Sequence, residues 1–143
     1  MKDIPRMAPH VLIIEDDPCY RRLLERYIQR CGAMSGYASD GRTGMEKALA
    51  GNYDLTLVDI QLPLLDGFMV ATLLREQGYT QPLIGMSSLR MEGMKPKALA
   101  VGFNDYHPKP ISEKAVSNLL VEYTQSFTDI QTQPAQELLG GFD

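Results

Sequence analysis

Short apolar segments alternate with longer amphipathic segments along this chain, and this alternation restricts its fold more than any other feature. Residues 10–14 and 55–58 are short, largely apolar runs, and each is followed directly by acidic residues. Apolar side chains at successive positions cover both faces of a strand, as in a parallel sheet with helices on both sides. The predicted strands are residues 10–14, 34–39, 55–58, 82–86 and 103–107.

The segments between these runs are typical of amphipathic helices. Asp17 followed by Pro18 suits a helix N-cap and the first helical position. From there, apolar residues recur at three- and four-residue spacing as far as Cys31, with arginines between them. Asp40, Asp66 and Ser112 are further candidate N-caps. The first three predicted helices end at Gly32, Gly51 and near Gly78, a fourth lies between residues 91 and 101, and the last extends to Phe127.

This order of elements predicts an α/β fold. Strands that alternate with helices through short loops form βαβ units, and these build a parallel sheet with helices on both faces. Five such repeats match a flavodoxin-like, doubly wound sheet. We expect a leader at residues 1–9, one domain at residues 10–127 and a flexible, polar C-terminal tail at residues 128–143.

Composition excludes several classes of protein. The chain has 143 residues and a net charge of -4, which argues against direct binding to nucleic acid. No apolar run is long enough to insert into a membrane, and residues 1–9 contain no apolar signal core. Cys19 and Cys31 lie about 18 Å apart on one predicted helix, too far for a disulfide. Reduced cysteines favour a cytoplasmic location.

Chemically active side chains are predicted to meet at one edge of the sheet. Glu15, Asp16 and Asp59 follow the first and third strands, and Ser87 and Lys109 follow the fourth and fifth. Active groups gather at the carboxyl ends of the strands in such folds. Capping and metal binding both remain open for Glu15 and Asp16, whereas Asp17 fits a helix cap. Three carboxylates together favour Mg²⁺, which with the Lys109 ammonium neutralises them and allows a phosphoryl group to bind.

Four motifs together resemble the receiver domain of bacterial two-component response regulators. They are VLIIEDDP at residues 11–18, DLTLVDIQLPLLDG at 54–67, the serine pair at 87–88, and DYHPKPI at 105–111. The resemblance implies the strand order 2-1-3-4-5 and a module that takes a phosphoryl group from a sensor histidine kinase or a histidine phosphotransfer protein. It implies a signalling domain, not an enzyme, that assists its own phosphorylation and dephosphorylation. It also allows a phosphorylation-dependent dimer with an unknown downstream target.

The resemblance assigns a role to each matching position. Asp59 would be the phosphorylated residue, and Asp16 and Asp59 would bind Mg²⁺ directly. The Gln61 main-chain carbonyl would be a further ligand, and Glu15 would hold the ion through water. The remaining assignments are Ser87, Ser88 and Lys109 for binding the phosphoryl group, Ser87 and Tyr106 for a conformational switch, and Pro110 for a cis peptide bond after Lys109.

Other functions fit the sequence less well. A Mg²⁺-dependent phosphatase of the haloacid-dehalogenase type needs an acid two residues after its nucleophile, where this chain has Gln61. A flavodoxin-type cofactor site needs glycines and hydroxyls after the first strand, and acids there repel phosphate. A receiver-like scaffold that is never phosphorylated has no need of the intact acids and lysine. A receiver module within a hybrid sensor kinase or a larger regulator remains an alternative.

Overall fold

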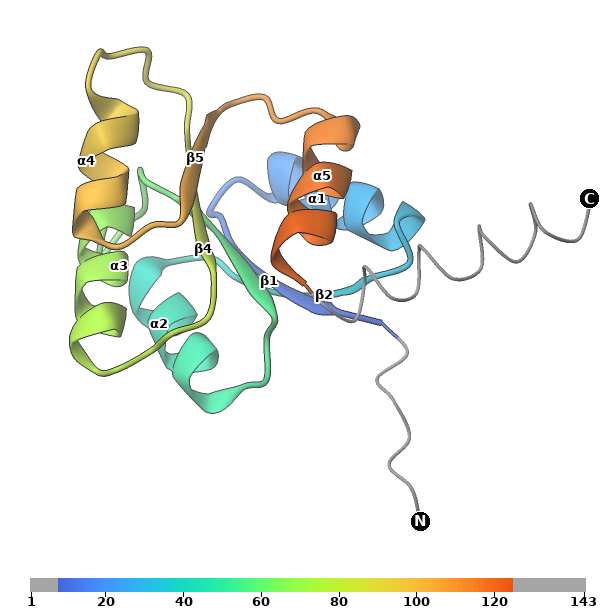
Figure 1. Cartoon of the computed structure of the whole chain (residues 1–143), viewed down its shortest axis with the longest axis horizontal. Coiled ribbons are helices and arrows are strands. Elements are labelled where there is room, and N and C mark those ends of the chain that lie inside the picture. The colour runs from blue at the N-terminus through green and yellow to red at the C-terminus, as the bar shows by residue number, and fades with distance from the viewer. Residues whose placement is uncertain (1–7, 125–143) are drawn as a thin grey trace, which may run out of the picture.

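The computed structural model describes residues 8–124, which form alternating strands and helices around one sheet (Figure 1). The predicted leader at residues 1–9 lies outside the described residues except for residues 8 and 9, and the predicted tail at residues 128–143 lies wholly outside them. The elements are β1 His10–Ile14, α1 Pro18–Arg30, β2 Met34–Ala38, α2 Gly41–Ala50, β3 Leu55–Asp59, α3 Gly67–Glu76, β4 Leu83–Ser87, α4 Met94–Val101, β5 Asp105–Pro108 and α5 Glu113–Tyr123.

The strand order is β2-β1-β3-β4-β5 and all neighbouring strands are parallel, which confirms the predicted fold class and order. Two apolar cores lie on opposite faces of this sheet. Leu24 of α1 and Val116 of α5 pack in one core, whereas Val70 of α3 and Ala98 of α4 pack in the other. Figure 1 shows the same layers, with α1 and α5 on one side of the sheet and α2, α3 and α4 on the other.

The predicted caps stand at the starts of their helices. The side chains of Asp17, Asp40, Asp66 and Ser112 each accept a hydrogen bond from a main-chain N–H in the first turn. The cysteines lie at the two ends of α1 and form no disulfide. No helix within residues 8–124 is long and apolar enough to cross a membrane.

The fifth strand begins two residues later than predicted. Gly102 ends α4 in a left-handed conformation (φ 121°), and the Phe103 N–H donates to the Ala98 carbonyl at 3.0 Å. Phe103 is therefore buried as part of the helix terminus, and β5 starts at Asp105. The last helix ends at Tyr123, and its predicted extension to Phe127 lies outside the described residues.

One arginine joins two connections, α3–β4 and α4–β5, at the edge of the sheet opposite the acidic residues. Arg75, near the end of α3, donates hydrogen bonds of 2.7–2.9 Å to the carbonyls of Tyr79, Gln81 and Gly102 and to the Asn104 side chain. The C-terminal end of α4 is therefore bound to the end of α3. The other end of α4 begins at Gly93 (φ 83°), and no side chain within the described chain caps it.

Candidate functional site

The carboxyl ends of β1 and β3 bring three acids together. One carboxylate oxygen each from Glu15, Asp16 and Asp59 lies within 4.8 Å of the others. Glu15 is fully buried and Asp59 is 3 % exposed, whereas Asp16 is open to solvent. The parallel register explains the meeting, because β1 and β3 are adjacent and end at the same edge of the sheet.

Lys109 supplies a positive charge to this group. Its ammonium lies 2.7 Å from Glu15 Oε1 and 3.2 Å from Asp59 Oδ2. The Lys109 residue follows β5, and its N–H donates to the Ser87 carbonyl at 2.8 Å, which ties the loop after β5 to the end of β4. The peptide bond between Lys109 and Pro110 is cis.

Main-chain groups fix the two buried carboxylates. The Gln61 N–H donates to Asp59 Oδ1 at 3.0 Å, and the Asp17 N–H donates to Glu15 Oε2 at 3.1 Å. Gly67 permits the tight turn after β3, since a Cβ at that position would lie 2.6 Å from the Asp59 carbonyl oxygen. Asp59 is thus held between its own loop and Lys109.

The electrostatics of the site follow from burial and charge. Burial, together with the negative charge of Asp59, raises the pKa of Glu15 to about 7, although Lys109 and the Asp17 N–H act against this shift. Burial alone would lower the pKa of Lys109, but the adjacent Glu15 and Asp59 carboxylates outweigh burial and raise it. Lys109 therefore stays positively charged, while the acids repel one another.

This donor set fits a hard divalent cation. Carboxylate oxygens are the ligands that Mg²⁺ prefers, and a +2 ion relieves the repulsion among Glu15, Asp16 and Asp59. The exposed Asp16 leaves the group open to solvent on one side, where an ion can keep several of its waters. The sequence left capping and metal binding open for Glu15 and Asp16. In the structure the N-cap of α1 is Asp17, and the carboxylates of Glu15 and Asp16 lie in the acidic group with Asp59.

The serine pair divides between a buried and an exposed position. Ser87 ends β4, is fully buried, and its hydroxyl accepts a hydrogen bond from the Leu89 N–H at 2.9 Å. Ser88 is exposed, and its hydroxyl donates to the Gln61 side chain at 3.2 Å. Ser87 is thus the last residue of β4 and Ser88 the first residue of the following loop, and Ser88 also contacts the loop that follows β3.

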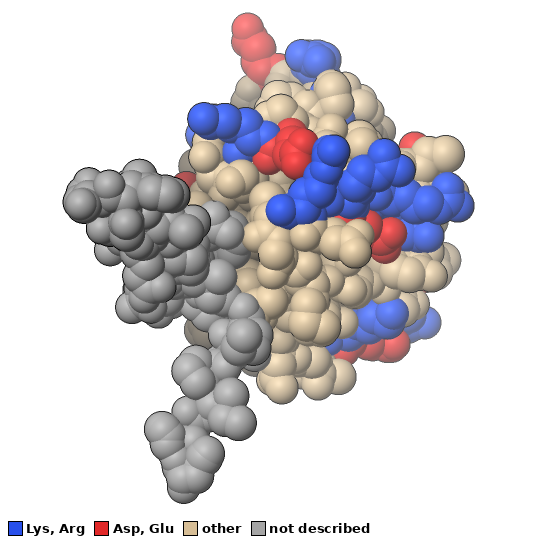
Figure 2. Space-filling view, turned by 90° about the vertical axis from the view of Figure 1, so that its right-hand side faces the viewer, with Lys and Arg blue, Asp and Glu red and all other residues tan. Residues whose placement is uncertain are grey.

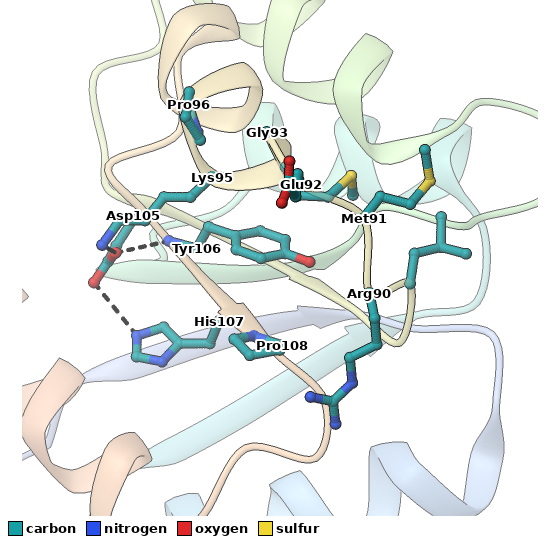
Figure 3. Close-up of a pocket in the computed structure, with 12 residues that line it drawn as sticks. Arg90, Met91, Glu92, Gly93, Lys95, Pro96, Asp105, Tyr106, His107 and Pro108 are labelled. Carbon is teal, nitrogen blue, oxygen red and sulfur yellow. Dashed lines mark hydrogen bonds and ion pairs between the residues drawn. The ribbon is translucent and has the colours of Figure 1, made fainter.

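Tyr106 lies under a hollow of about 680 Å³ between α4 and β5. Figure 3 shows its ring across this hollow, with the hydroxyl directed toward the loop that carries Arg90 and Met91. The ring is 9 % exposed and its hydroxyl has no hydrogen-bond partner among residues 8–124. Tyr106 is thus a buried aromatic residue with an unused polar group.

The sequence pattern did not identify Tyr20 as part of the site, because its spacing on α1 marks it only as a core-facing position. Its ring centroid lies 4.6 Å from the Lys109 ammonium, and its hydroxyl accepts a hydrogen bond from the Ile111 N–H at 2.9 Å. Tyr20 therefore positions Lys109 and the loop after β5.

The fold and this site define a class of protein: a flavodoxin-like α/β domain with an acidic site at the carboxyl edge of its sheet and a lysine ion-paired to two of the acids. A family model described as the response regulator receiver domain matches residues 11–121. The chain belongs to this family and is a receiver domain of two-component signalling systems, a signalling domain. The sequence-based identification is confirmed.

Among curated relatives, the transcriptional regulatory protein SrrA of Staphylococcus aureus is 36 % identical over 131 residues, which cover 90 % of this chain and 54 % of SrrA. The chain therefore spans about half the length of this relative. The receiver domain of the sensor histidine kinase PA1611 from Pseudomonas aeruginosa, solved with magnesium in its active-site cleft, superposes with a TM-score of 0.74 at 27 % identity, covering 81 % of this chain and 97 % of that one.

A second similar structure contains a receiver domain with a partner. It is the co-crystal structure of the Saccharomyces cerevisiae histidine phosphotransfer protein Ypd1 and the receiver domain of the response regulator Ssk1. The match has a TM-score of 0.73 and 25 % identity and covers 85 % of this chain and 91 % of that one. Receiver domains similar to this chain therefore occur both in a sensor kinase and in a phosphotransfer complex.

Proposed function

We propose that Asp59 accepts a phosphoryl group from a phosphohistidine on a sensor kinase or a histidine phosphotransfer protein. The observation that supports this proposal is the meeting of three carboxylates within 4.8 Å beside the Lys109 ammonium, at the end of the strand that carries Asp59. Magnesium fits this donor set and would be held by Glu15, Asp16, Asp59 and the Gln61 main-chain carbonyl. When bound, the ion supplies charge neutralisation for the incoming phosphoryl oxygens.

The chain's own groups then perform the transfer. A carboxylate oxygen of Asp59 attacks the phosphorus, an O–P bond forms, the N–P bond of the donor breaks, and the imidazole leaves with the bonding electrons. The Gln61 N–H orients the Asp59 carboxylate, and the Lys109 ammonium pairs with the phosphoryl oxygens. The Ser87 and Ser88 hydroxyls bind the phosphoryl group from the neighbouring strand end. The same groups assist hydrolysis of the aspartyl phosphate by water.

Ser87 and Tyr106 are the proposed switch. To bind a phosphoryl oxygen, the Ser87 hydroxyl turns toward Asp59 and gives up its hydrogen bond from the Leu89 N–H. That change repositions the loop beside the hollow over Tyr106. The Tyr106 ring, whose hydroxyl has no hydrogen-bond partner among residues 8–124, can then adopt a second packed position. The surface formed by α4, β5 and α5 would then present different contacts to a downstream target.

The surface beside the site suits a negatively charged partner. Figure 2 looks onto the side where α1, α5 and β2 lie and shows several Lys and Arg side chains, with Asp and Glu side chains beside them. Arg22 and Arg26 are exposed along α1, which begins next to the acidic site, and Arg30 at its far end is paired with Glu113 at 3.2 Å. We infer that a phosphodonor protein docks there in the cytoplasm. A receiver module within a hybrid sensor kinase or a larger regulator remains the alternative, and a phosphorylation-dependent dimer remains a prediction.

Mass spectrometry after treatment with acetyl phosphate tests the phosphorylation site directly. We expect one added phosphoryl group in the presence of Mg²⁺, none in EDTA, and none in Asp59→Asn. Asp66→Asn is the matched control, because Asp66 caps α3 outside the acidic site and its variant should be modified like the parent. A phosphorylated Asp59→Asn variant would overturn the assignment.

The switch has its own test. NMR spectra of the unmodified and beryllofluoride-treated protein should differ over residues 88–111 in the parent. Ser87→Ala should still accept the phosphoryl group but lose these shifts. Equal shifts in Ser87→Ala, or none in the parent, would refute the role of Ser87 and leave the phosphorylation proposal intact.

A further inference from the structure

A groove between α2 and α3 lies outside the proposed phosphorylation site. Its volume is about 370 Å³, and it is lined by Arg42 and Met45 of α2, Leu73 of α3, and Leu64 and Leu65 of the connecting loop after β3. Four of these five side chains are apolar. A partly open apolar hollow on the surface of a domain is typical of a protein contact site.

Leu64 lies at the rim of this groove, and both its exposure and its backbone conformation are unusual. It is 81 % exposed, the most exposed large apolar side chain among residues 8–124. It is also the single residue other than glycine with positive φ in that range, at 69°. A left-handed leucine costs roughly 1 kcal/mol relative to glycine, and burial of the side chain within this molecule offsets none of that cost. Both facts point to a role that lies outside the isolated domain.

The loop that carries Leu64 is held firmly against α2. The Gly41 N–H donates to the Pro63 carbonyl at 3.4 Å, and the Leu65 N–H donates to the same oxygen at 2.7 Å. A side chain on Gly41 would overlap the Leu65 carbonyl, so glycine at the start of α2 permits this close approach. Leu64 is therefore displayed from a fixed backbone, which lowers the entropy lost on contact.

The apolar surface continues along both helices. Leu49 lies one turn beyond Met45 on α2, Met69 lies one turn before Leu73 on α3, and both Leu49 and Met69 are exposed. Charged side chains accompany this stripe. Arg42 and Glu46 are exposed one turn apart on α2, so this helix presents charges of both signs to a partner, while the exposed Asp66 lies at the start of α3 beside Met69.

We propose that this α2–α3 face, defined by the groove together with Glu46, Leu49 and Met69, binds a second copy of the chain in a two-fold pair. The protruding Leu64 and the groove lie side by side on one face, so a two-fold axis brings each Leu64 against the other copy's groove. The same axis runs the two α2 helices antiparallel and places Arg42 of each copy beside Glu46 of the other. A partner with a uniformly acidic or basic surface would leave one of these charges opposed by its like.

This proposal is independent of phosphorylation, because the groove and Leu64 exist in the unmodified protein. Sedimentation velocity of the full chain in EDTA, without phosphodonor and at concentrations up to about 0.5 mM, should show a reversible dimer with a Kd on the order of 10–100 µM. Asp59→Asn should dimerise equally. A failure to dimerise would thus leave the proposed phosphorylation untouched.

Variants of Leu64 test the contact itself. Leu64→Gly suits the positive φ and keeps the fold, yet removes the side chain, and Leu64→Glu places a charge in the apolar contact. Both should raise the Kd by about tenfold or more. Leu99→Glu alters a leucine on α4 that is 44 % exposed, and should leave the Kd unchanged. Circular dichroism melting curves establish that each variant is folded.

Charge reversal tests the geometry. Arg42→Glu and Glu46→Arg should each weaken the dimer, because every two-fold pair then contains two repulsive contacts. The double variant should recover the parent Kd. A parent that stays monomeric at all concentrations, a double variant no tighter than either single one, or an equal effect of Leu99→Glu would each overturn the proposal and assign the face to a different occupant.

Discussion

The buried carboxyl of Glu15 makes the stability of the metal-free protein depend on pH in an unusual direction. Its pKa rises from 4.5 in the unfolded chain to about 7 in the folded one. Below pH 4.5 the Glu15 carboxyl is neutral in both the folded and the unfolded chain, so its burial does not lower the free energy of unfolding through ionisation. As pH rises toward and through about 7, the unfolded chain ionises first, so this contribution to the free energy of unfolding is lost.

The size of the effect follows from the same two pKa values. Each unit of pKa difference is equivalent to about 1.4 kcal/mol. Integrated over the titration, the free energy of unfolding should fall by about 2 kcal/mol between about pH 5.5 and about pH 8.5. For a domain of this size, that change corresponds to a decrease in Tm of about 7 °C.

Thermal unfolding in EDTA across this pH range measures the effect, with Glu15→Gln as the matched variant. Glutamine keeps an oxygen that can accept the hydrogen bond from the Asp17 N–H, but it cannot ionise. Its Tm should therefore lack the decrease assigned to Glu15. Both proteins retain every other titratable group, so the difference between their curves isolates Glu15.

Magnesium provides the second half of the test. A divalent cation favours the ionised carboxylate, so the increase in Tm on adding Mg²⁺ should be larger at high pH than at low pH. Two curves of equal slope for the parent and Glu15→Gln would refute the reasoning, as would an increase in Tm that does not change with pH.

Three further variants test the site, the core and the Arg75 contacts. Asp59→Asn removes one negative charge from the cluster while Lys109 keeps Glu15 as a partner, so its Tm in EDTA should exceed that of the parent, and a lower Tm would contradict mutual repulsion. Leu24→Ala, in the fully buried core between α1 and the sheet, should cost about 3 kcal/mol in urea unfolding. Arg75→Met should cost about 2 kcal/mol in the same assay, because the carbonyls of Tyr79, Gln81 and Gly102 lose the Arg75 donor, whereas Asn104 Oδ1 keeps its hydrogen bond from the Leu83 N–H.

Much of this architecture could be predicted from local pattern. The apolar runs and the capping residues located the strands and the helix starts, because burial on both faces and orphan N–H groups impose strict residue types. The acids and Lys109 could be predicted to meet because every parallel strand ends at the same edge of the sheet. Gly102 was the less obvious signal: it extends the end of α4 by local hydrogen bonding and delays β5 to Asp105.

Other features depend on contacts between distant segments and leave no local pattern. Tyr20 has the spacing of a core residue, yet it reaches across to Lys109, 89 positions later in the chain. Leu64 sits in an apolar stretch that suggests burial, and the left-handed turn after Pro63 exposes it instead. The backbone geometry of a single turn decides the direction of that side chain, and composition cannot supply it.

The two ends of α4 are attached to the rest of the domain in different ways. Arg75 and the glycine terminus fix the C-terminal end, whereas the end at Gly93 follows the loop from Ser87 and is held by the buried Met94 and by the Lys95–Asp105 ion pair at 3.5 Å. Eight helical residues span about 12 Å, so a rotation of about 10° about the C-terminal end displaces the N-terminal end by about 2 Å. Under the proposed switch, a displacement of the loop at the acidic edge would turn α4 about its C-terminal end, and Met94 and the Lys95–Asp105 pair would have to shift with it.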